Sequence, residues 1–119
     1  MDYIPPNQTV RSDRPRRRLS SRTLQTGGTI LYECPSGKSA EVLHLTLCNT
    51  HTASVTVRVH HLLPSEAVGV NNAIFYDLTL VAQSTLTDDG GYTLNAGERI
   101  YASASVGSVL CVALYGTES

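Results

Sequence analysis

From Thr29 to the C-terminus, hydrophobic and polar residues alternate in short runs with a period of two. Such alternation is typical of strands with one buried face, because successive side chains of a strand point to opposite sides of the sheet. No segment shows the 3.6-residue spacing of an amphipathic helix. The pattern therefore predicts an all-β protein.

Seven or eight short strands follow from this alternation, with turn residues between them. In the second of them, Leu43, Leu45 and Leu47 are expected on one face. In the third, the valines are expected inward and His60 outward. The expected strands cover residues 29–33, 40–49, 54–61, 73–81, part of 84–94, 100–106 and 109–116.

The connections between these strands predict how they are arranged. Asn49–Ala53 is polar and short, so it is interpreted as a hairpin loop. Residues 62–72 lose the alternation and are interpreted as a long loop that changes sheets. Many short strands with regular turn signals indicate an antiparallel β-sandwich, jelly-roll-like in its arrangement.

The N-terminal residues differ sharply from the rest of the chain. Residues 1–22 hold six arginines and two aspartates, a net charge of +4, whereas residues 23–119 carry a net charge of −5. Three prolines and few apolar residues make residues 1–23 unsuited to a core of their own, so order is expected only on a partner. The sequence predicts an extended basic arm over 1–23 and a β-sandwich domain over 24–119.

Two uses of this arm follow from its charge. Arginines can neutralise phosphates, but no aromatic residue lies between Tyr3 and Tyr32 to stack on bases. Guanidinium groups also pair with carboxylates on a neighbouring protein subunit, and this anchoring role is favoured over nucleic-acid binding. The expected anchoring residues are Tyr3, Ile4, Arg11, Arg14, Arg16, Arg17, Arg18 and Arg22.

Candidate catalytic and metal-binding groups are sparse. His60 and His61 are adjacent in a strand and face opposite sides, although His44 could neighbour His60 if their strands pair. Asp88 and Asp89 precede two glycines and indicate a turn. No GxSxG or phosphate-loop pattern is present. The sequence therefore predicts no enzyme activity, no metal and no cofactor.

The three cysteines show no CxxC spacing, so they are interpreted as reduced, buried thiols (Cys34, Cys48 and Cys111). No apolar run resembles a signal peptide or approaches the length of a membrane helix. A soluble protein made in a reducing cytoplasm is expected.

Several runs of the chain resemble small structural proteins of tailed-bacteriophage virions. The similarity covers about residues 29–115, without the arm, and is carried by "ILYECPSGKSAEVLHLTLCN", by "NAIFYDLTLVAQSTL" and by "LNAGERIYASAS". It implies a β-sandwich building block of the virion, most often a head decoration (cement) protein. Such modules oligomerise, commonly as trimers, on the major capsid protein or other virion proteins. The matching residues include Tyr32, Pro35, Gly37, Lys38, Ala40, Cys48, Asn49, Val55, Val57, Val59, Leu94, Asn95, Ala96, Gly97 and Ser103.

Two alternatives remain open at this point. A tail, neck or fibre module that binds a host receptor or glycan would expose aromatic side chains such as Phe75, Tyr76, Tyr92 or Tyr101. A nucleic-acid-binding coat protein would use the arm on a genome, since a basic arm before a jelly roll is similar to the coat proteins of small RNA viruses.

Overall fold

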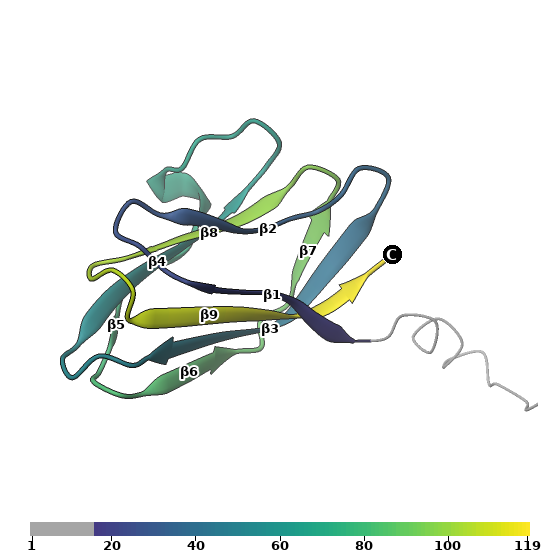
Figure 1. Ribbon diagram of the computed structural model, residues 1–119. Helices are drawn as coiled ribbons and strands as arrows, with labels where there is room; N and C mark the ends of the chain where they lie inside the picture. The colour runs from purple at the N-terminus through teal and green to yellow at the C-terminus, as the bar shows by residue number, and fades with distance from the viewer. Residues whose placement is uncertain (1–15) are drawn as a thin grey trace, which may run out of the picture.

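The computed structural model describes residues 16–119 as nine antiparallel strands and one short 3-10 helix, η1 (Val70–Asn72) (Figure 1). The all-β prediction is confirmed, with nine strands in place of seven or eight. The strands are β1 (Arg17–Thr23), β2 (Thr29–Glu33), β3 (Ser39–Asn49), β4 (Val55–Leu62), β5 (Ala73–Leu80), β6 (Thr85–Asp88), β7 (Tyr92–Asn95), β8 (Arg99–Ala104) and β9 (Leu110–Glu118).

Two sheets face each other. The first has the order β1-β9-β3-β6, with β7 also paired to β3, and the second has the order β2-β8-β4-β5. The pairs β4–β5, β3–β6, β2–β8 and β1–β9 are nested, as in one long hairpin, and the pairs β3–β9 and β4–β8 close each sheet. A rolled long hairpin of eight strands is a jelly roll. Here β7 is a ninth strand added between β6 and β8.

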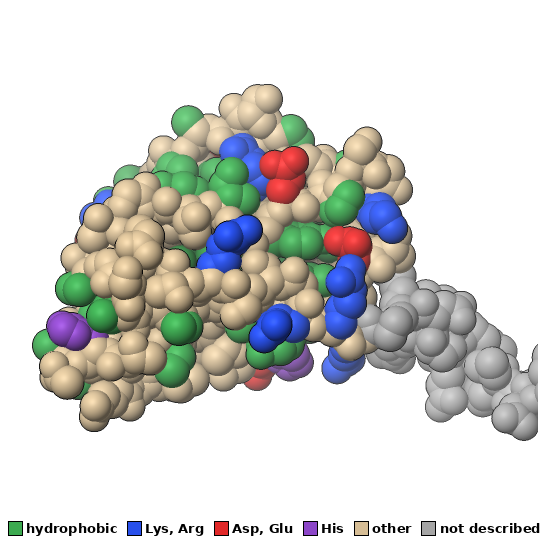
Figure 2. Space-filling view, viewed as in Figure 1, with side chains coloured by type: hydrophobic (Ala, Val, Ile, Leu, Met, Phe, Trp, Pro, Cys, Tyr) green, Lys and Arg blue, Asp and Glu red, His purple; other side chains and the backbone are tan. Residues whose placement is uncertain are grey.

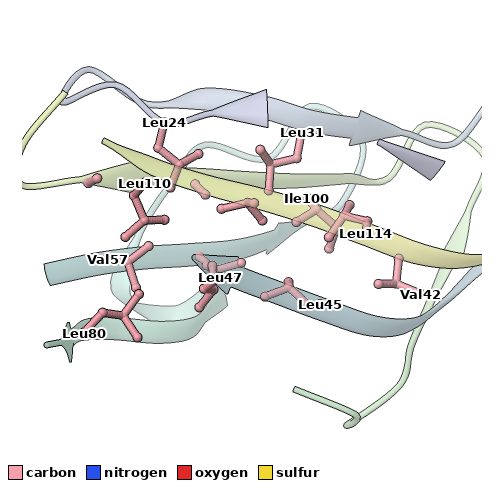
Figure 3. Close-up of a cluster of buried hydrophobic side chains, with 14 of the residues drawn as sticks. Leu24, Leu31, Val42, Leu45, Leu47, Val57, Leu80, Ile100, Leu110 and Leu114 are labelled. Carbon is pink, nitrogen blue, oxygen red and sulfur yellow. The ribbon is translucent and has the colours of Figure 1, made fainter. Parts of the chain in front are cut away.

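The hydrophobic core fills the space between the sheets (Figure 3). Leu47 of β3 and Leu110 of β9 come from one sheet, and Val57 of β4 and Leu80 of β5 come from the other. Each of these side chains is at most 4% exposed. The alternating apolar positions of the sequence therefore form the inner face of each sheet, and the two inner faces pack against each other as predicted.

The expected boundary of the arm at residue 23 lies inside the sheet. Arg17–Thr23 forms β1, which pairs along β9 at the edge of the five-stranded sheet. The prediction missed this strand because nearly all its side chains are exposed, so no alternation marks it. Backbone hydrogen bonds to β9 hold it, together with Leu19, which packs against the core.

A β-bulge changes the expected faces of β3. The register of β3 against β9 shifts between Val42 and His44, so that Leu43 is the extra residue. Val42, Leu45 and Leu47 are therefore buried, and Leu43 is only partly buried. The prediction that Leu43 shares a face with Leu45 and Leu47 is wrong, because a bulge advances the alternation by one residue.

Both predicted connections also differ from the structure. Asn49–Ala53 does not close a hairpin, because β3 and β4 lie in opposite sheets. The connection 62–72 stays within one sheet, because β4 pairs with β5. It covers His60, which is on the outer face as expected but is only 2% exposed. His44 and His60 are not brought together by strand pairing, because β3 and β4 lie in opposite sheets.

Candidate functional site

The arginine residues that the structure describes gather along β1. Arg16, Arg17, Arg18 and Arg22 are all exposed. In the space-filling view, blue side chains lie along the side of the molecule that carries β1 (Figure 2). We call Arg16–Thr23 the basic edge. The other expected anchoring residues, Tyr3, Ile4, Arg11 and Arg14, lie outside the described residues.

Only one arginine of the basic edge is ion-paired within the described chain. The Arg17 guanidinium lies 3.1 Å from the Glu118 carboxylate, which also accepts a hydrogen bond from the Tyr32 hydroxyl. No carboxylate among residues 16–119 pairs with Arg18 or Arg22. Their guanidinium groups therefore have their full hydrogen-bonding capacity available to a partner.

The backbone of the basic edge is also available on one side. β1 pairs with β9 alone, and it is the terminal strand of its sheet. Its position is further fixed by the Ser20 hydroxyl, which donates to the Leu31 carbonyl oxygen of β2. An edge strand presents unpaired N–H and C=O groups, onto which an extended segment of another chain can add. The basic edge thus combines positive charge with a place for a further strand.

A second candidate site lies on the outer face of the four-stranded sheet. The register pairs Arg58 with Ser103 and His60 with Tyr101, and these positions alternate with the buried Val57 and Val59. Two adjoining shallow hollows of about 170 and 270 Å³ lie here. Both are lined by Thr26, Arg58 and Ser103, and the larger one also by His60, Val68, Gly69, Val70, Tyr76 and Tyr101. We call this surface the tyrosine hollow.

A bulge in β5 builds one wall of the tyrosine hollow. The register of β4 against β5 shifts between Val57 and Val59, so that the consecutive residues Tyr76 and Asp77 stand opposite Arg58. Asp77 has a φ of 54°, a left-handed conformation that Asp tolerates better than most residues. Tyr76 is 48% exposed as a result.

Arg58 connects the charged and aromatic groups of this wall. Its Nε and Nη2 donate to the two carboxylate oxygens of Asp77 at 2.7 and 3.2 Å, and its Cζ lies 4.2 Å from the centre of the Tyr76 ring. The hydrogen bonds to Arg58 lower the pKa of Asp77, so the carboxylate stays ionised at mild acidity. The same hydrogen bonds raise the pKa of Arg58. The Tyr76 ring is therefore held in place beside the Arg58–Asp77 ion pair.

The remaining aromatic candidates are less accessible. Tyr92 is partly buried, and its hydroxyl donates to Asp88. Burial, followed by the Asp88 hydrogen bond and charge, raises the pKa of Tyr92 to about 12. Phe75 packs against the hydrophobic core. Tyr76 and Tyr101 are therefore the aromatic residues brought together on one surface.

The histidines do not form a common site. Within residues 16–119, no group of three or more His, Cys, Asp and Glu side chains is arranged to hold a metal ion. Three histidines instead have separate partners. These are Asp89 for His44 (2.6 Å), Asn72 for His60 (2.8 Å) and Glu98 for His61 (2.7 Å).

The cysteines correct one expectation. Cys34 is buried as predicted, but Cys48 is half-buried and Cys111 is exposed. Both occupy outward-facing positions of the five-stranded sheet, next to the buried Leu47 and Val112.

In the part of the chain from residue 16 on, no helix is long and apolar enough to cross a bilayer.

No protein-family model matches the chain, and a search of curated proteins finds no match.

Proposed function

We propose that this protein is a non-enzymatic structural component of a phage virion, a capsid decoration (cement) protein held on neighbouring subunits by its basic N-terminal segment. The observation that supports this most is the basic edge, where Arg18 and Arg22 have no carboxylate partner among residues 16–119 and the strand that carries them is open to a further strand. Jelly rolls are also common in viral capsid proteins, which is an argument by analogy of fold.

The proposed partners carry negative charge. The major capsid protein, another virion protein or a second copy of this chain would supply carboxylates to the guanidinium groups. A second copy qualifies because residues 23–119 carry a net charge of −5. Charge-assisted bonds along an extended strand would hold a homo-oligomer, and the resemblance to phage virion proteins favours a trimer. The same bonds could instead hold each copy on the capsid lattice.

The first experiment locates the protein and tests the basic edge. Particles separated into heads and tails on a density gradient are probed for the chain, and heads that lack it are then used for rebinding. Arg18→Gln with Arg22→Gln in the full chain is expected to weaken rebinding about tenfold, since each replacement removes charge-assisted bonds at low stability cost. Affinity of the unmodified chain is expected to fall with salt.

The controls separate the basic edge from the segment before it. Lys38→Gln removes an exposed positive charge elsewhere and should rebind normally. A version starting at Arg16 keeps β1 whole, whereas one starting at Thr23 would remove most of a strand of the sheet. Tail location, or normal rebinding of the double variant, would contradict the anchoring role. Steep, salt-dependent binding of the unmodified chain to DNA or RNA would favour the nucleic-acid alternative.

The tyrosine hollow favours a second candidate function, binding of a host receptor or glycan by a tail, neck or fibre module. A flat ring beside hydrogen-bonding groups suits a ligand that has both apolar faces and hydroxyl groups, such as a sugar. Tyr76→Ala is expected to abolish adsorption of the virion to host cells or binding to a glycan array. Tyr115→Ala, which removes a 38%-exposed tyrosine from the other sheet, is the matched control. If Tyr76→Ala binds host cells and glycans as well as Tyr115→Ala does, the tyrosine hollow is not the binding site.

A further inference from the structure

Two of the three cysteines stand directly opposite each other on adjacent strands. Cys48 of β3 pairs in register with Cys111 of β9. Their chain neighbours Leu47 and Val112 point into the core, so both thiols lie on the outer face of the five-stranded sheet. This face is open to solvent at Cys111 and partly open at Cys48.

The ladder places the two Cα atoms within the range of a disulfide. The Thr50 N–H donates to the Val109 carbonyl oxygen at 2.9 Å, which makes Thr50 and Val109 a hydrogen-bonded pair. Hydrogen-bonded pairs recur at every second position, so Cys48 and Cys111 form the next one, with Cα atoms about 5.5 Å apart. Disulfides span Cα separations of about 4.4–6.8 Å.

We propose that Cys48 and Cys111 form a reversible cross-strand disulfide, a redox-sensitive site on the outer face of the sheet. In a reducing cytoplasm the two thiols stay free, and in an oxidising medium they close. The reaction needs a disulfide oxidant, such as oxidised glutathione, because two thiols lose two electrons and two protons when they join.

The steps follow thiol–disulfide exchange. The thiolate of Cys111, the more exposed of the two, attacks one sulfur of oxidised glutathione, forms a mixed disulfide and releases one glutathione thiolate. The thiolate of Cys48 then attacks the Cys111 sulfur of that mixed disulfide and releases the second glutathione. Two protein thiols are oxidised and one glutathione disulfide is reduced to two thiols.

Cys34 is excluded from this exchange by its position. It is 1% exposed, and its Sγ lies 3.4 Å from the Lys38 carbonyl oxygen. Burial raises the pKa of the Cys34 thiol, so less of the reactive thiolate is present. One thiol per chain should therefore survive oxidation.

The position of the bridge makes it easy to reopen. Cys111 is exposed and Cys48 is half-buried, so a reducing thiol can reach the bond between them. Exposed disulfides are readily reduced. Closing the bridge links the two strands at the centre of the five-stranded sheet, and opening it restores their freedom.

The test exposes the folded full chain to oxidised glutathione at pH 8, followed by alkylation of the remaining thiols and intact-mass analysis. The expected result is loss of two of the three thiols, with a mass lower by two hydrogen atoms before alkylation and a Cys48–Cys111 peptide on digestion. Reduced glutathione in excess should restore all three thiols. Cys34→Ala is the matched control and should still lose two.

Single variants of the pair show whether the two thiols act together. Cys48→Ser is expected to stop at a stable glutathione adduct on Cys111, because no second thiol resolves it. Three surviving thiols in the unmodified chain would overturn the proposal. So would a stable glutathione adduct without an internal bridge, or disulfide-linked dimers as the main product.

Discussion

Gly116→Ala is expected to lower the free energy of unfolding by about 3 kcal/mol, a large part of the stability of a single domain. A Cβ at this position would lie 1.7 Å from the Glu41 carbonyl oxygen and 3.1 Å from the Val42 Cα. Both are backbone atoms of β3, so no side-chain rotation relieves the contact. Gly116 stands opposite the bulge at Leu43, where the two backbones approach closely.

Urea unfolding followed by circular dichroism measures this effect. Gly27→Ala is the matched control, because a Cβ there meets nothing within 4 Å, and its effect should stay under about 0.5 kcal/mol. If the two variants unfold at the same urea concentration, β3 and β9 do not approach each other at Gly116 as described. Because β9 pairs with both β1 and β3, Gly116→Ala should also weaken the pairing that holds the basic edge.

The strands that the sequence predicted are those with one buried and one exposed face. The alternation over 54–61 and 100–106 marks β4 and β8, because Val57 and Ala102 must point inward while Arg58 and Ser103 point to solvent. A jelly-roll-like sandwich followed from the number of such strands and their turns. The pairing did not, because alternation says which side of a sheet a residue faces and not which strand lies beside it.

The elements that were missed depend on contacts between distant residues. β1 has no periodic pattern and is held by its pairing with β9, by Leu19 against the core and by the Ser20 hydrogen bond to β2. The bulge at Leu43 is marked in the sequence only by Gly116, more than 70 positions away, since that glycine is required where the backbones approach.

The candidate sites were predictable to different degrees. Charge alone pointed to the arginines of the basic edge. Tyr76 and Tyr101 were expected to be exposed in a receptor-binding module, but their meeting on one surface depends on the pairing of β5, β4 and β8. The wall made by Arg58 and Asp77 depends on a bulge and on the left-handed conformation of Asp77, neither of which has a sequence signal here.

Asn49→Ala is expected to destabilise the fold by about 3 kcal/mol, because Asn49 joins the two sheets at one end of the sandwich. Asn49 is 1% exposed at the end of β3. Its Nδ2 lies 3.1 Å from three carbonyl oxygens, and its Oδ1 accepts from the His51 N–H at 2.9 Å. The carbonyl groups belong to Ala53, Leu80 and Val81, in the connection from β3 to β4 and at the end of β5.

Replacement by Asp separates the lost donor from lost volume. Asn49→Asp has nearly the same size but places a carboxylate against carbonyl oxygens, so it should be at least as destabilising as Asn49→Ala at pH 7. Burial would raise the pKa of the introduced carboxyl group above its unfolded value of about 3.9. The stability of this variant relative to Asn49→Ala should therefore be highest below pH 4 and should fall as the pH rises, because the groups that the two variants share cancel in the difference. Asn95 is exposed, so Asn95→Ala serves as the control when urea unfolding is measured at pH 7 and below pH 4. If Asn49→Asp were as stable as Asn95→Ala at pH 7, the amide donor would not be what holds the two sheets together at this end.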